Sequence, residues 1–188
     1  MSTIEKINAY EILDSRGIPT LLTQVVLDNG VEGNAAVPSG ASTGIHEALE
    51  LRDKDKNRYN GKGVLNNIDF INSLILDALQ GFDVRDQKNI DSNLLKLDDT
   101  KNKSKLGANT LLSVSLAVAK TASNLNKVDL YKYLGGINTN LLPIPLVNVI
   151  NGGAHAANNL DIQEYMLAPV GAKTFSQAIR WCSEIFFN

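Results

Sequence analysis

The chain has 188 residues, of which 44% are hydrophobic and 20% are charged, a composition typical of a globular rather than a disordered protein. Lys and Arg number 18 against 20 Asp and Glu, and the net charge of -2 gives no reason to expect nucleic acid or a membrane surface as a partner. Residues 1–11 lack the apolar core of a signal peptide, and the most apolar stretch, residues 111–119, is too short to span a bilayer. The single cysteine, Cys182, cannot form an internal disulfide. These features predict a soluble, cytoplasmic protein.

The first part of the chain has the pattern of strands followed by helices. Strands are predicted at residues 4–13, 20–28 and 31–37. The last two strands meet across Asp28-Asn29-Gly30, where Asn-Gly is expected to supply the positive φ angles of a tight hairpin turn. Helices are predicted at residues 64–79, 85–97 and 106–125, the second of them behind Asp83 as N-cap. This order predicts an α+β domain, with the helices packed on one face of a three-stranded antiparallel sheet.

The pattern changes around Gly135 and Gly136, where glycines are expected to end a helix and prolines to open an extended linker. We therefore predict two domains, residues 1–138 and residues 139–188. The second is predicted to contain strands at residues 145–151 and 162–169 and a helix after Thr174, with Gln177 completing a capping box. This last helix has no glycine cap at its end, so we expect the chain to be a segment of a longer protein.

The loop at residues 37–47 is the first candidate site. Ser39, Ser42 and Thr43 stand with two glycines in six residues, which combines backbone donors with hard oxygen ligands. Such a loop is suited to closing over a phosphate or to offering oxygen to Mg²⁺. It is not a Walker loop, because no Gly-Lys-Ser/Thr ends it. An ordinary connecting loop explains the same composition.

The loop at residues 151–165 is the second candidate site. No helix separates the strands on either side, so we expect them to run antiparallel and to place the loop ends at one edge of the sheet. This arrangement would gather five polar side chains, those of Asn151, His155, Asp161, Gln163 and Glu164. Strict alternation would put Glu164 on one face with Ile162 and Met166, where burying a carboxylate is costly without a function. A solvated strand end with a surface histidine is the alternative reading.

Taken together with their flanks, the two loops resemble the enolase family. The matching motifs are Leu13-Asp-Ser-Arg-Gly, Val37-Pro-Ser-Gly-Ala-Ser-Thr-Gly, His46-Glu-Ala-Leu-Glu-Leu-Arg-Asp, Leu106-Gly-Ala-Asn, Asn148-Val-Ile-Asn-Gly-Gly-Ala-His-Ala and Gln163-Glu-Tyr-Met. They stand in the order and spacing of the family. The resemblance implies an α+β capping domain followed by the first β-β-α elements of an incomplete α/β, TIM-like barrel.

The resemblance also implies a reaction, the reversible dehydration of 2-phosphoglycerate to phosphoenolpyruvate with Mg²⁺ as cofactor. Enolase-superfamily sites pair a Lys or His base with one or two Mg²⁺ ions. By resemblance, Ser42 would be a ligand of the second Mg²⁺, and His155 would approach the phosphate end of the substrate. Gln163 would hold the substrate, and Glu164 would assist departure of the C3 hydroxyl.

Other parts of the family's site would lie beyond residue 188: the catalytic lysine, the principal acid, the ligands of the first Mg²⁺ and the phosphate-gripping Arg-Ser pair. The family also implies a homodimer or a higher homo-oligomer. Ile18 replaces the usual Asn of the first motif, and Leu22 and Gln24 replace acidic residues on a strand that contributes to the dimer contact. A non-catalytic remnant, or a fragment that acts by binding, is the alternative function.

Overall fold

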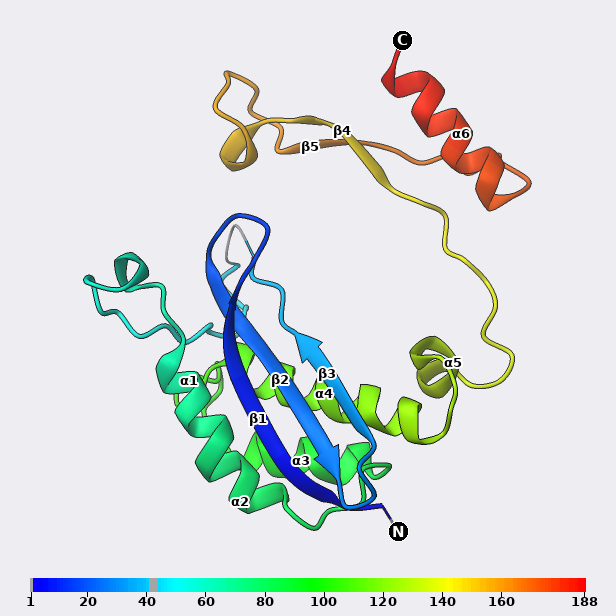
Figure 1. Cartoon of the computed structure of the whole chain (residues 1–188). Coiled ribbons are helices and arrows are strands. Elements are labelled where there is room, and N and C mark those ends of the chain that lie inside the picture. Colours follow the sequence, from blue (N-terminus) through cyan, green and yellow to red (C-terminus); the bar gives the residue numbers. More distant parts are fainter. Residues whose placement is uncertain (1, 41–43) are drawn as a thin grey trace. The chain divides into compact units, whose positions relative to one another are not determined.

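The computed structural model describes residues 2–40 and 44–188, and it divides into two compact units, Met1–Asn138 (unit 1) and Thr139–Asn188 (unit 2). Unit 1 opens with an antiparallel sheet in the order β1-β2-β3, formed by β1 (Ile4–Leu13), β2 (Pro19–Leu27) and β3 (Glu32–Ala36) (Figure 1). The predicted strands are confirmed to within two residues at every end. The predicted turn is only partly right, because Gly30 alone has a positive φ, of 79°. The β2–β3 connection, residues 28–31, is closed by the N–H of Gly30, which donates to the Leu27 carbonyl at 2.9 Å.

One face of this sheet is buried and the other is not. Along β2, Leu21, Thr23, Val25 and Leu27 are buried, whereas the residues between them are only half-buried. This two-residue period follows from the pleat of a strand, and it shows that the helices cover a single face. The α+β prediction is confirmed in this respect.

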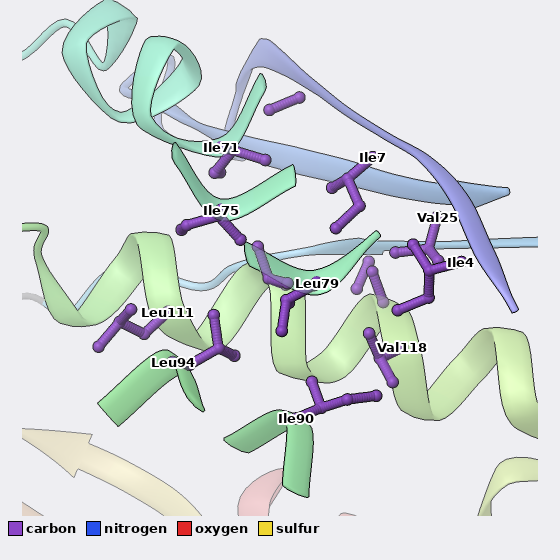
Figure 2. Close-up of a cluster of buried hydrophobic side chains, with 14 of the residues drawn as sticks. Ile4, Ile7, Val25, Ile71, Ile75, Leu79, Ile90, Leu94, Leu111 and Val118 are labelled. Atoms are coloured by element: carbon purple, nitrogen blue, oxygen red, sulfur yellow. The ribbon is translucent and has the colours of Figure 1, made fainter. Parts of the chain in front are cut away.

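The first helical segment runs through α1 (Leu65–Phe70), a π-helical turn η2 (Ile71–Ile75) and α2 (Leu76–Leu79), after a short 3₁₀ turn η1 (Tyr59–Gly61). The predicted helix at residues 64–79 is thus present, with one turn wound more widely than an α-helix. Ile71, Ile75 and Leu79 are fully buried beneath the sheet (Figure 2).

Helix α3 (Gln87–Leu97) begins two residues later than expected, and its N-cap is Asp86 rather than Asp83. The Asp86 carboxylate accepts the N–H of Asn89 at 3.3 Å. Asp83 is occupied elsewhere, because it accepts both the backbone N–H and the guanidinium of Arg85. Helix α4 (Ala108–Leu125) is the central buried helix of unit 1, and α5 (Leu130–Gly135) follows it. Ile90, Leu94, Leu111 and Val118 of α3 and α4 pack in one core with Ile4, Ile7 and Val25 of the sheet (Figure 2).

Amide side chains from the helical layer bond to both outer strands of the sheet. Asn72 accepts the N–H of Ala9 at 2.8 Å, and Gln80 donates to the carbonyl of Glu5 at 3.2 Å, both on β1. On the opposite edge, Asn124 donates to the carbonyl of Glu32 on β3 at 2.8 Å. These bonds attach the helices to the sheet through its backbone as well as through the apolar core.

Unit 2 contains a two-stranded antiparallel sheet, β4 (Val147–Asn151) and β5 (Glu164–Leu167), the 3₁₀ turn η3 (Gly153–His155) between them, and helix α6 (Phe175–Phe186). The antiparallel direction and the Thr174 N-cap are as predicted, and Thr174 accepts the N–H of Gln177 at 3.1 Å. Ile150 of β4 is 49% exposed. Within the part of the chain that the structure describes, no helix is long and apolar enough to cross a membrane.

Candidate functional site

The β4–β5 loop is held in a compact form by two backbone hydrogen bonds. Gly152 donates to the carbonyl of Gln163 at 2.9 Å, and Gly153 donates to that of Leu160 at 2.7 Å. A Cβ on Gly152 would lie 2.4 Å from the Ile162 carbonyl oxygen, so only glycine fits at this position without a shift of the backbone. Gly153 has a positive φ of 53°. The Gly-Gly pair therefore turns the chain back on itself and sets the position of His155, two residues further on.

His155, Gln163 and Glu164, hereafter the His155 cluster, are in direct contact. The imidazole Nδ1 lies 3.2 Å from Oε1 of Glu164, and the imidazole Nε2 lies 2.9 Å from Nε2 of Gln163. The same amide nitrogen lies 3.5 Å from Nδ1, so the Gln163 amide lies against the face of the imidazole, while the Glu164 carboxylate lies beside Nδ1.

The cluster is accessible from solvent. The side chains of His155 and Glu164 are 24% and 32% exposed, so a ligand can reach both. At this exposure the His155–Glu164 contact adds little to stability, even when the histidine is charged. The arrangement can therefore serve chemistry without being needed for folding.

The five-residue grouping expected from the sequence is reduced to three. Asn151 lies opposite Glu164 in the sheet register, but its own polar atoms bond to Asn148 and Asn158. Asp161 is exposed, and its carboxylate makes no hydrogen bond or ion pair with the described residues. Gln163 and Glu164 both contact His155, and Gln163 precedes the first residue of β5, Glu164.

The predicted metal ligand Ser42 lies outside the described residues. Among the residues that are described, no group of three or more His, Cys, Asp or Glu side chains is placed to hold a metal ion. Glu164 and His155 form a pair, and Asp161 does not join them. The described residues therefore do not fit a complete divalent-metal site.

The sequence did not predict the steric role of Gly152, nor the contacts of Leu160 and Ile162 with it. The signal was present as two adjacent glycines after an apolar strand. It could not be interpreted without the return path of the loop, whose carbonyl groups at residues 160 and 162 crowd Gly152.

The chain thus consists of an α+β unit followed by a unit of two antiparallel strands and a helix, with a polar site on a loop of the second. Residues 4–134 match the family described as "Enolase, N-terminal domain", and residues 139–188 match "Enolase, C-terminal TIM barrel domain". The chain belongs to the enolase family. The resemblance seen in the motifs is thereby confirmed.

Proposed function

We propose that the complete protein is an enolase, a lyase that reversibly dehydrates 2-phosphoglycerate to phosphoenolpyruvate. The observation that carries the proposal is the His155 cluster, in which the three residues matching the family's substrate-contacting positions meet at one solvent-accessible place. The two family matches, which together extend from residue 4 to residue 188, support the same conclusion.

In this proposal Glu164 assists departure of the C3 hydroxyl, working beside a second glutamate from the remainder of the barrel domain. Two close carboxylates disfavour each other's ionised forms, which allows one of them to hold a proton at neutral pH. Gln163 binds the substrate by hydrogen bonding. His155 approaches the phosphate end, where a donated N–H would stabilise the anion.

We propose Mg²⁺ as the cofactor and Ser42 as one of its ligands, on the strength of the family resemblance. The other ligands would come from the remainder of the barrel domain, since a (β/α)₈ barrel needs about 250 residues and the match here covers residues 139–188. We further propose that β4, β5 and α6 are the first elements of that barrel. Cytoplasmic location and a homodimer or higher homo-oligomer complete the proposal.

A spectrophotometric assay for phosphoenolpyruvate, run on the complete protein with and without EDTA, tests this function. We expect turnover of 2-phosphoglycerate that disappears with EDTA and returns with added Mg²⁺. Turnover that persists after complete removal of divalent metal would refute the proposed mechanism.

A further inference from the structure

Two of the family motifs in unit 1, the one at residues 13–17 and the one at residues 46–53, have no role in the function proposed above. Side chains from both form hydrogen bonds with Ser39, near the start of the first loop. The Asp14-Ser-Arg-Gly motif forms the turn between β1 and β2, and there Nη2 of Arg16 donates to the Ser39 carbonyl at 2.9 Å. In the motif at residues 46–53, Oε2 of Glu50 accepts from the Ser39 hydroxyl at 2.8 Å. Nη2 of Arg52 donates to the same hydroxyl at 3.1 Å.

Arg16 is itself held in place by its own turn. Oδ1 of Asp14 accepts the N–H of Arg16 at 2.8 Å and that of Ile18 at 2.9 Å, while Oδ2 accepts from the guanidinium at 3.1 Å. Gly17 provides the positive φ of 74° that this turn requires. The guanidinium therefore reaches Ser39 from a fixed position.

Arg52 connects Ser39 to three further acceptors. Its Nη1 donates to the carbonyls of Pro19, at the start of β2, and of Lys62, the latter at 3.0 Å. Its Nη2 also donates to Glu50 at 2.9 Å. The side chain is only 18% exposed, and the planar fork of an arginine is what allows one group to serve all four acceptors.

We propose that Arg16, Glu50 and Arg52 are positioning residues that hold Ser39 and so fix the direction in which the chain enters the first loop. The Ser39 hydroxyl donates to Glu50 and accepts from Arg52, so its single proton is already used. Ser39 therefore acts as an anchor, and its proton is not available for donation to a phosphate. Only the catalytic consequence of this anchor depends on the proposed function.

NMR relaxation of the 188-residue chain tests the anchor directly. In the unmodified chain we expect backbone order parameters of about 0.85 at Ser39 and Gly40, the value of rigid backbone. Ser39→Ala should lower them below about 0.6, whereas Ser39→Thr, which keeps the hydroxyl, should not. Arg52→Lys, which keeps the charge but loses the fork, should lower them too. The matched control is Ser92→Ala in α3, whose hydroxyl donates to the carbonyl of Lys88 on the same helix. Unchanged order parameters in both Ser39→Ala and Arg52→Lys would overturn the proposal.

Kinetics of the complete enzyme test the catalytic consequence. Ser39→Ala should lower kcat/KM by about 10-fold to 10²-fold while the melting temperature stays close to that of Ser92→Ala. A mobile Ser39 with unchanged kcat/KM would overturn the link to catalysis. An unmodified complete protein without lyase activity would instead refute the proposed function and leave the NMR result standing.

Discussion

The imidazole of His155 and the carboxylate of Glu164 are 3.2 Å apart, measured from Nδ1 to Oε1. We propose roles for these two side chains at different ends of one substrate, and yet they touch each other directly. A substitution at one of them therefore changes the surroundings of the other. Predictions about this site must treat the two residues as a pair.

Glu164→Gln in the complete enzyme should lower kcat by about 10² to 10⁴, the usual size of acid–base assistance, and should change KM much less. The amide keeps the size of the side chain but cannot exchange a proton with the departing hydroxyl. Steady-state kinetics measure both quantities. Glu184→Gln is the matched control, because that side chain is 60% exposed and its carboxylate forms an ion pair with Arg180 on its own helix. A kcat within about threefold of the unmodified enzyme would place Glu164 outside the chemistry.

Combining His155→Asn with Glu164→Gln should cost less than the sum of the two single effects. Each single change already removes the pairing of a carboxylate with an imidazole, so the double variant cannot lose that pairing twice. We expect a coupling of about 0.5–3 kcal/mol in a cycle built on kcat/KM. In the control cycle, His155→Asn is combined with Glu184→Gln, and the two effects on kcat/KM should add. If the effects of His155→Asn and Glu164→Gln also add, the contact between these two side chains has no part in catalysis.

Gly152→Ala should lower kcat/KM by up to about 10²-fold, because the added Cβ would push the loop away from the Ile162 carbonyl and displace His155. Gly171→Ala is the control, since its Cβ would meet only the Trp181 ring, at 4.0 Å. Kinetics and circular dichroism of both variants separate displacement of the loop from loss of the fold. Equal activity of the two variants would contradict the steric argument.

Glu11→Gln should destabilise unit 1 by about 1–3 kcal/mol at neutral pH. Its carboxylate accepts from both Nη atoms of Arg58 and from the N–H of Val64 at 3.0 Å, and its side chain is only 10% exposed. The hydrogen bond from Arg58 is the largest cause that lowers the pKa of Glu11 below its ordinary value of 4.5. Because the pKa is lower in the folded state, the ionised carboxylate adds its full contribution to the free energy of unfolding when the pH is above the ordinary pKa. This contribution is lost as the pH falls through the folded-state pKa.

Urea unfolding of the unmodified chain and of Glu11→Gln, repeated at decreasing pH, measures this contribution. The difference between them should be constant near neutrality and should shrink below about pH 4.5. Glu5→Gln on the same strand is the control, because Glu5 is 49% exposed on its side chain and pairs with Lys6 only at 3.9 Å. A difference that grows on acidification would contradict the assignment.

The isolated 188-residue chain should have no lyase activity, and proteases should shorten it to about the Gly135-Gly136 pair. Unit 1 has its own core, whereas residues 136–146 form no helix or strand and include the highly exposed Ile137 and Leu141. Exposed backbone without regular structure is the usual place of cleavage. Mass spectrometry after limited trypsin or elastase digestion identifies the product. Resistance through residue 188 in a monomer, or turnover by purified chain, would contradict this expectation.

Strand positions in unit 1 were predictable because alternation and a turn residue act over a few neighbours. The π-helical turn at Ile71–Ile75 was not, since its apolar residues at positions 71 and 75 also fit an ordinary helix. The choice between Asp83 and Asp86 as N-cap depended on Arg85, which binds Asp83 and leaves Asp86 available. A sequence pattern does not show that competition.

In the candidate site, too, features set by local sequence were predictable and features set by contacts between distant residues were not. The contact between His155 and Glu164 was predictable in outline, because two antiparallel strands must return the chain to the same edge. The position of Gln163 was not, since it depends on where β5 begins. The convergence of Arg16, Glu50 and Arg52 on Ser39 joins segments up to 36 positions apart, between residues 16 and 52, and no local period indicates it.

The amide side chains on the outer strands of unit 1 also limit how the sheet can be extended. A strand from a neighbouring molecule joins a sheet through free N–H and C=O groups along an edge. On β1 the N–H of Ala9 is already bonded to Asn72, and on β3 the carbonyl of Glu32 is bonded to Asn124. An incoming strand would have to displace both the amide and the helix that carries it. The helical layer thus discourages strand addition at both sides of the sheet while the apolar face remains covered.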